Sequence, residues 1–170
     1  EMHGVNPDIV ILGKPIANGH PMGAVVTTSE IAEAFDNGME FFSSFGGNPV
    51  SCEIGKAVLQ VIEDEALQKH AFTVGNYKKS LLEELKQEFY ELGDIRGSGL
   101  FLGIELIKDD QLTPNTELAK HLKNEFRKRN ILVSTDGPFN SVIKSKPPMC
   151  FSKANADELV EQLQNILKNV

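Results

Sequence analysis

The sequence predicts an α/β fold, and three features of the chain support that prediction. A short apolar run, Ile9–Leu12, has the length and composition of a buried strand and leads into a loop rich in proline and glycine. A β-branched stretch at 23–28 indicates a second strand. Apolar residues then recur at helical spacing after Pro49, and strands and helices alternate again to the end of the chain. This succession is typical of a mixed α/β protein.

Composition and charge exclude several classes of partner. The 170 residues are 41% hydrophobic and 24% charged, which are values of a globular protein, and the length is enough for one ordinary domain or one and a half. The net charge of −7 argues against nucleic acid or an anionic membrane surface as a partner. Two cysteines, Cys52 and Cys150, cannot form a disulfide framework, which favours free thiols in the cytoplasm. No histidine has metal-ligand spacing to another histidine or cysteine, so we expect no metal site.

The first part of the chain is expected to contain two strands and two helices around the loop that follows Ile9–Leu12. Ser29 can cap a short helix, and Asn48 followed by Pro49 is a strong start signal for a longer one. The expected elements are strands at 9–12 and 23–28 and helices at 30–36 and 49–64.

The second part of the chain is expected to form a smaller α/β domain, with the boundary near residue 65. The stretch 93–99, which contains Arg96, leads into the stretch 100–107, and together they are the best strand pair of the chain. The expected order is a helix at 67–92, strands across 93–107, a helix from Asn115 or Thr116 to residue 129, strands at 131–134 and 142–145, and a last helix capped by Ser152 or Asn155.

Lys14 follows the first strand directly and is the candidate catalytic residue. Burying an unpaired ammonium is costly, and Pro15 disfavours a helical conformation for Lys14, so the lysine is expected on a shaped loop. Open α/β sheets bind their ligands at such strand ends. A desolvated lysine there has a lowered pKa and can attack an aldehyde through its amine. Taken alone, these observations leave open that Lys14 is an ordinary surface lysine.

The string Asp-Ile-Val-Ile-Leu-Gly-Lys-Pro-Ile-Ala-Asn-Gly-His-Pro-Met-Gly-Ala-Val-Val, residues 8–26, resembles the lysine motif of class III (ω-type) aminotransferases. These are fold-type I enzymes that use pyridoxal 5'-phosphate (PLP), and the matching lysine carries the cofactor as a Schiff base. The resemblance therefore implies that Lys14 is the catalytic and cofactor-binding lysine. It also implies that residues 1–65 are the C-terminal part of the PLP-binding large domain with its connecting helix, and that residues 66–170 are the small C-terminal α/β domain.

The resemblance covers essentially the whole chain, but family members have a long region before this lysine that the chain lacks. That region supplies the phosphate cradle, the aromatic that stacks on the cofactor ring and the aspartate at the pyridinium nitrogen. We therefore interpret the chain as the C-terminal portion of a larger enzyme.

A second candidate site precedes the helix at Pro49. The sequence Gly46-Gly47-Asn48-Pro49 offers free N–H groups to an anion, although an ordinary capped helix would show the same pattern. In the family, the hydroxyl residue just before Phe-Gly-Gly-Asn-Pro contacts the PLP phosphate of the neighbouring subunit. The resemblance thus implies this role for Ser44, where the family usually has threonine, and a homodimer with the active site at the subunit interface. The same role for Ser43 is less well supported.

A third candidate, Lys144, concerns the substrate. In class III enzymes that use amino acids, an arginine commonly stands three residues before the Pro147-Pro148 pair and binds the substrate carboxylate. Lysine lacks the planar fork of arginine, and the surrounding residues look like the phospho-lyase branch, which eliminates phosphate from ethanolamine phosphate or 5-phosphohydroxylysine. Strand alternation would place Lys146 on the same face as Lys144. It remains open that both are plain lysines of an edge strand.

Other polar motifs are expected to be structural. His20 is six residues past Lys14 and suits a hydrogen bond that fixes the loop better than a general acid or base. Gly97-Ser98-Gly99 lacks the third glycine of a nucleotide-binding loop and precedes a strand, so it predicts a tight turn, with Arg96 in a structural role.

The sequence therefore predicts the C-terminal portion of a PLP-dependent class III aminotransferase-like enzyme. Its substrate would be a small primary amine, converted by transamination with a keto-acid acceptor or by elimination of phosphate. Because the phosphate cradle is missing, this portion alone is expected to be inactive. The alternative is an inactive folded fragment, or a part of a multidomain fusion that has no activity of its own.

Overall fold

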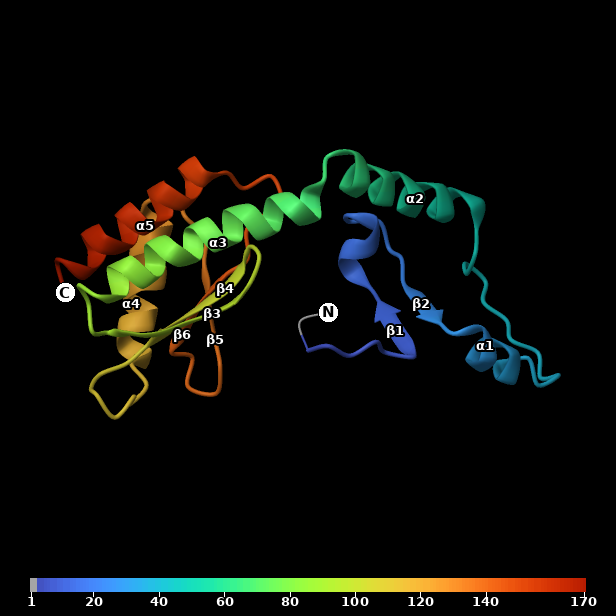
Figure 1. Cartoon of the computed structure of the whole chain (residues 1–170), viewed down its shortest axis with the longest axis horizontal. Coiled ribbons are helices and arrows are strands. Elements are labelled where there is room, and N and C mark those ends of the chain that lie inside the picture. The colour runs from blue at the N-terminus through green and yellow to red at the C-terminus, as the bar shows by residue number, and fades with distance from the viewer. Residues whose placement is uncertain (1–2) are drawn as a thin grey trace. The chain divides into compact units, whose positions relative to one another are not determined.

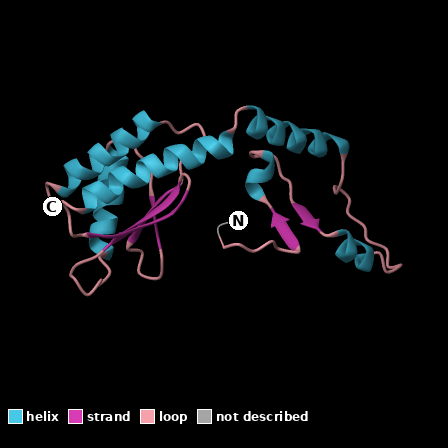
Figure 2. Cartoon of the chain, in the orientation of Figure 1, coloured by secondary structure: helices cyan, strands magenta, loops and turns pink. Residues whose placement is uncertain are grey.

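The structure is a computed structural model that describes residues 3–170, and the chain divides into two compact units (Figure 1). Unit 1 ends at Ala66 and unit 2 is Leu67–Val170. Both contain helices and strands, which confirms the predicted α/β class (Figure 2). The elements of unit 1 are β1 (Ile9–Leu12), the 3-10 helix η1 (Lys14–Ala17), β2 (Ala24–Thr27), α1 (Ser29–Phe35) and α2 (Pro49–Asp64).

The sheet of unit 1 consists of β1 and β2 in antiparallel pairing, with Ile9 opposite Thr27 and Leu12 opposite Ala24. The prediction that β1 is buried was wrong for this chain, because all four of its residues are exposed and Ile11 reaches 80% exposure. The two faces of a two-stranded sheet are buried only where other elements pack on them, and here both faces are exposed to solvent. The apolar composition of β1 therefore reflects packing that residues 3–170 do not provide.

A capping residue sets the start of α2 in unit 1. Asn48 caps α2, and its side-chain oxygen accepts a hydrogen bond from the Ser51 N–H at 2.9 Å. Pro49 is the first helical residue, as predicted. The short helix α1 begins one residue earlier than expected, with Thr28 in place of Ser29 at the N-cap.

Unit 2 contains a four-stranded antiparallel sheet in the order β3-β4-β6-β5 and three helices. Helices α3 and α5 lie side by side, and α4 packs against α5 and the sheet (Figure 1). Asn115 caps α4, and Ser152 and Asn155 form a reciprocal capping box at α5. The elements are α3 (Leu67–Lys86), β3 (Leu92–Ser98), β4 (Phe101–Leu106), α4 (Thr116–Lys128), β5 (Ser134–Asp136), β6 (Val142–Ser145) and α5 (Lys153–Leu167).

The strand register gives this sheet one apolar and one charged face. Ile95, Ile104 and Ile143 lie opposite one another on neighbouring strands and belong to the core under the helices. The adjacent row places Arg96, Gly103 and Lys144 on the other face, because successive residues of a strand alternate between faces. The remaining core residues come mainly from the three helices: Leu82, Leu85, Leu118, Ala119, Leu122, Phe126, Leu163, Ile166 and Leu167.

Two predicted boundaries in unit 2 were wrong. Helix α3 ends at Lys86 rather than at residue 92, because Leu92 is already the first, fully buried residue of β3. Strand β5 is Ser134–Asp136 rather than 131–134. The N–H of Ile131 bonds to the carbonyl of Phe126 and so completes the end of α4, which delays the strand.

The turn between β3 and β4 has the expected tight geometry. Gly97 and Gly99 have φ angles of 132° and 53°, which a residue with a Cβ rarely adopts. Arg96 forms ion pairs with Asp94 and Glu105 on the same pair of strands, in agreement with a structural role. Within residues 3–170, no helix has the length and apolar character needed to cross a membrane.

Candidate functional site

Lys14 stands at the end of β1 in an unusual backbone conformation. Its φ is 44°, in the left-handed region, and Pro15 follows it. Lys14 therefore opens the 3-10 turn without adopting the right-handed helical conformation that proline disfavours for the residue before it. A left-handed non-glycine residue costs on the order of 1 kcal/mol and is concentrated at functional sites. Lys14 shares this conformation with five other non-glycine residues among residues 3–170, and it is the one of the six that stands just after a strand and precedes a proline.

The side chain of Lys14 is exposed, so the expectation of a desolvated amine is not met in this chain. The amine is exposed because β1, the strand before Lys14, is itself exposed, and no other element packs on either face of the β1–β2 sheet. The structure gives the Lys14 amine no hydrogen bond to residues 3–170 and leaves it available to other groups.

The loop after Lys14 is tied to the first turns of α2. His20 Nε2 lies 2.7 Å from Ser51 Oγ, which confirms the predicted loop-fixing hydrogen bond. Asn48 Nδ2 donates to the same hydroxyl at 2.9 Å. Met22 packs on Gly55, where an added Cβ would lie 2.7 Å from the methionine sulfur. These contacts hold the lysine loop against the helix start that was predicted to bind an anion.

A cavity of about 500 Å³ separates this loop from the stretch before α2. His20, Ser43 and Gly47 are among its lining residues. The hydroxyl of Ser43 is engaged within the chain, because its Oγ accepts a hydrogen bond from the Gly46 N–H at 3.0 Å. Lys14 and Ser44 do not line the cavity, and Ser44 is exposed. The structure therefore does not bring the two candidate cofactor residues together within one chain.

Lys144 lies on the charged face of the unit 2 sheet and already has a partner. Its Nζ donates to Asp136 Oδ2 at 2.5 Å, across the antiparallel pair β5–β6. The second oxygen of Asp136 accepts from the Gly137 N–H at 2.8 Å. Lys144 and, to a smaller extent, this N–H lower the pKa of the Asp136 carboxyl. Sequence reasoning missed Asp136, because the strand expected at 131–134 ends before it.

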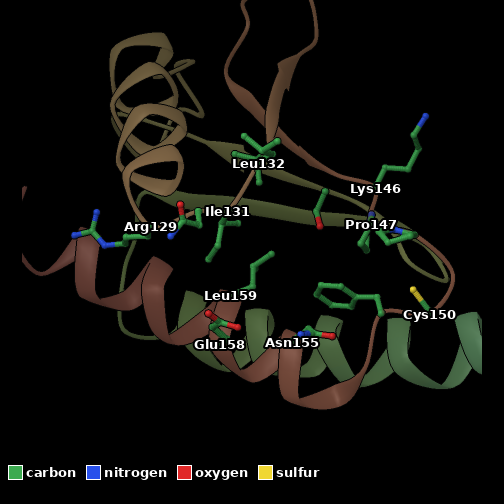
Figure 3. A pocket seen from close by; sticks show the side chains of 14 residues that line it. Arg129, Ile131, Leu132, Lys146, Pro147, Cys150, Asn155, Glu158 and Leu159 are labelled. Carbon is green, nitrogen blue, oxygen red and sulfur yellow. The ribbon is translucent and has the colours of Figure 1, made fainter.

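Lys146 has a different environment from Lys144. Strand β6 ends at Ser145, so the expected alternation no longer fixes the direction of the next lysine. Lys146 is exposed and lines one edge of a cavity of about 530 Å³, with its side chain directed away from it (Figure 3). Among residues 3–170, no group of three or more histidine, cysteine, aspartate or glutamate side chains could hold a metal ion.

Comparison with known proteins identifies the family to which this chain belongs. The family model described as aminotransferase class III matches residues 1–167. The chain belongs to the class III aminotransferase family. A Drosophila melanogaster protein named alanine–glyoxylate aminotransferase 2-like is 51% identical over 163 residues, which are 94% of this chain and 33% of that protein. A Caenorhabditis elegans ethanolamine-phosphate phospho-lyase homolog 1 is 41% identical over 96% of this chain and 36% of its own length.

Solved structures show the same fold. A phospholyase from Arthrobacter, in complex with phosphoethanolamine, matches with a TM-score of 0.94 and 41% identity, over 99% of this chain and 40% of that chain. The acetylornithine aminotransferase of Elizabethkingia anophelis matches with a TM-score of 0.85 and 27% identity, over 99% of this chain and 43% of that chain. The chain spans about a third of the length of the curated relatives that it matches.

Proposed function

We propose that the protein to which this chain belongs is a PLP-dependent enzyme that acts on a primary amine, with Lys14 as the residue that holds the cofactor. The observation that carries the proposal is the place of Lys14 just after β1 and before Pro15, in a chain of the class III family. Its amine has no hydrogen bond to residues 3–170 and can therefore form a bond with an aldehyde group. Bound PLP would supply an electron sink for the carbon next to the substrate nitrogen. Released when the substrate amine takes its place on the cofactor, the Lys14 amine would take the proton from that carbon as general base.

The stretch before α2 would supply a phosphate contact. Ser44 is exposed and lies outside its own chain's cavity, which suits a contact with the cofactor of a second subunit. We therefore propose a homodimer in which Ser44 of one subunit binds the PLP phosphate of the other. The nearby hydroxyl of Ser43 is engaged with the Gly46 N–H and would shape the loop.

For the substrate, we favour a phosphorylated amine from which phosphate is eliminated. Paired recognition of a carboxylate needs the two parallel N–H donors of an arginine, which Lys144 lacks. The single positive charge of a lysine binds phosphate well. The names of the Arthrobacter and Caenorhabditis relatives support this choice. Transamination with a keto-acid acceptor is the second candidate, supported by the name of the Drosophila relative.

A parallel assay on the full-length protein separates the two. Release of phosphate and ammonia from ethanolamine phosphate is compared with keto-acid formation from alanine, ornithine and 4-aminobutyrate. We expect phosphate release to dominate. Efficient transamination without phosphate release would reject the elimination and leave Lys144 a lysine of the sheet surface.

Two narrower proposals concern the chain itself and its compartment. Residues 1–170 alone should bind PLP poorly, and PLP titration followed by visible absorbance tests this.

We propose a cytoplasmic location because both cysteines are free. A relative from Arabidopsis thaliana carries the word mitochondrial in its name, so fractionation of the full-length protein decides between the two compartments.

A further inference from the structure

A buried lysine in unit 2 has no place in the function proposed above. Lys78 of α3 has an exposed fraction of 0%. Its Nζ donates to the Leu100 carbonyl at 3.0 Å and to Ser145 Oγ at 3.0 Å, and lies 5.5 Å from the centre of the Phe151 ring. None of these partners is a carboxylate. A buried ammonium without a counter-ion is costly, so tight packing of the core does not explain why a lysine stands at position 78.

The three partners of Lys78 belong to three different segments. Leu100 is in the turn between β3 and β4, Ser145 ends β6, and Phe151 precedes α5. One helical turn before Lys78, Gly75 packs so closely on the β3–β4 turn that an added Cβ would lie 2.1 Å from the Gly99 backbone. Helix α3 is thus fixed on the turn by a glycine, and the lysine extends from there to β6 and α5.

The segment between Ser145 and Phe151, residues 146–150, has cavities on two sides. One cavity, of about 530 Å³, lies between this loop, residues 129–133 and α5 (Figure 3), and the other, of about 410 Å³, lies between the loop, α3 and the β3–β4 turn. Lys146 and Pro147 line both. The position of loop 146–150 therefore depends on the contacts at its two ends. Lys78 contacts both ends, and His70 Nε2 adds a hydrogen bond to the Phe151 carbonyl at 2.9 Å.

We propose that Lys78 is a positioning residue for substrate recognition, which fixes the end of β6 and loop 146–150 and thereby the places of Lys144 and Lys146. The proposal rests on the proposed function, in which Lys144 faces the substrate. Ser145 turns toward Lys78 on the inner face of the sheet, and its neighbour Lys144 lies on the outer face. A shift of Ser145 moves Lys144 with it.

The charge of Lys78 makes this anchor sensitive to pH. Burial lowers the pKa of Lys78 to about 8, so the ammonium is lost in mildly alkaline solution together with its attraction to the Phe151 ring. Other ionisable groups nearby are engaged elsewhere. On α3, Tyr77 donates to Asp157 of α5 at 2.6 Å and lies under the Lys153 amine, and His70 is bound to a carbonyl.

The test uses full-length Lys78→Met, with Lys79→Met as the matched control because Lys79 is the adjacent residue and is not fully buried. Hydrogen exchange is measured first at the amide of Phe151, which donates to the Pro148 carbonyl at 3.0 Å. We expect exchange about tenfold faster in Lys78→Met, the scale of one lost hydrogen bond, and no change in Lys79→Met. Should Lys78→Met fail to fold, Ser145→Ala removes one partner of the amine and must show the same direction of change.

The kinetic arm uses whichever amine the enzyme turns over. We expect Lys78→Met to raise KM about tenfold with kcat within about twofold, because binding is lost more than chemistry. The KM of the unmodified enzyme should rise above about pH 8, and that of the variant should stay flat. Unchanged exchange, or an unchanged KM, overturns the proposal. If only amino acids are substrates and their KM still responds, the phosphorylated-amine assignment fails and the positioning role of Lys78 stands.

Discussion

Removing the charge of Lys78 should change how the stability of unit 2 depends on pH. The folded-state pKa is about 8 and the ordinary value is 10.5, so the folded chain binds fewer protons than the unfolded chain between these values. The free energy of unfolding must then rise as pH rises through this window. The whole shift corresponds to about 3 kcal/mol, of which about 2 kcal/mol falls between about pH 6.5 and 9.5.

Lys78→Met should abolish this gain, because methionine has a similar length and no proton to lose. At neutral pH, the variant should be at least as stable as the unmodified chain. Relief of the buried charge offsets the cost of about 1–3 kcal/mol for leaving the Leu100 carbonyl and the Ser145 hydroxyl unpaired.

Urea unfolding followed by tyrosine fluorescence measures this directly. The chain has two tyrosines, Tyr77 and Tyr90, and no tryptophan, so the signal reports unit 2. The free energy of unfolding is compared for the unmodified chain, Lys78→Met and the control Lys79→Met at several pH values in this window. Parallel pH curves for the unmodified chain and Lys78→Met would refute the reasoning.

Two further predictions concern contacts in each unit. In the full-length dimer, Ser44→Ala should weaken PLP binding by about 1–2 kcal/mol, the scale of one hydrogen bond to a charged group, with little change in the chemical step. Unchanged affinity in a PLP titration would remove Ser44 from the phosphate site. Gly75→Ala should destabilise unit 2 by about 2 kcal/mol or more, because its Cβ would meet the Gly99 backbone at 2.1 Å. Equal unfolding midpoints for Gly75→Ala and the exposed control Asn76→Ala would contradict that close packing.

Local signals in the sequence predicted the starts of α2, α4 and α5. Asn48 with Pro49, Asn115, and Ser152 with Asn155 all cap the helices at which they were placed. Capping is a contact between residues a few positions apart, so it can be inferred without knowledge of the fold.

Features that depend on distant residues were less predictable. The start of β5 follows from its pairing with β6, and the same pairing brings Asp136 to Lys144. The apolar composition of β1 correctly indicated a strand but not its exposure, because burial depends on layers outside residues 3–170. Lys78 could not be recognised at all. Its position in an amphipathic helix gives no sign that the helix face on which it lies is covered by the β3–β4 turn and β6.

The measurement that tests the central claim most directly is the location of the cofactor on the full-length protein. Borohydride reduction of the PLP-loaded enzyme, followed by peptide mapping, identifies the lysine that holds the cofactor. We predict a single pyridoxyl label on Lys14, and loss of both label and turnover in Lys14→Ala. A label on any other lysine, or turnover that persists without Lys14, would contradict the account.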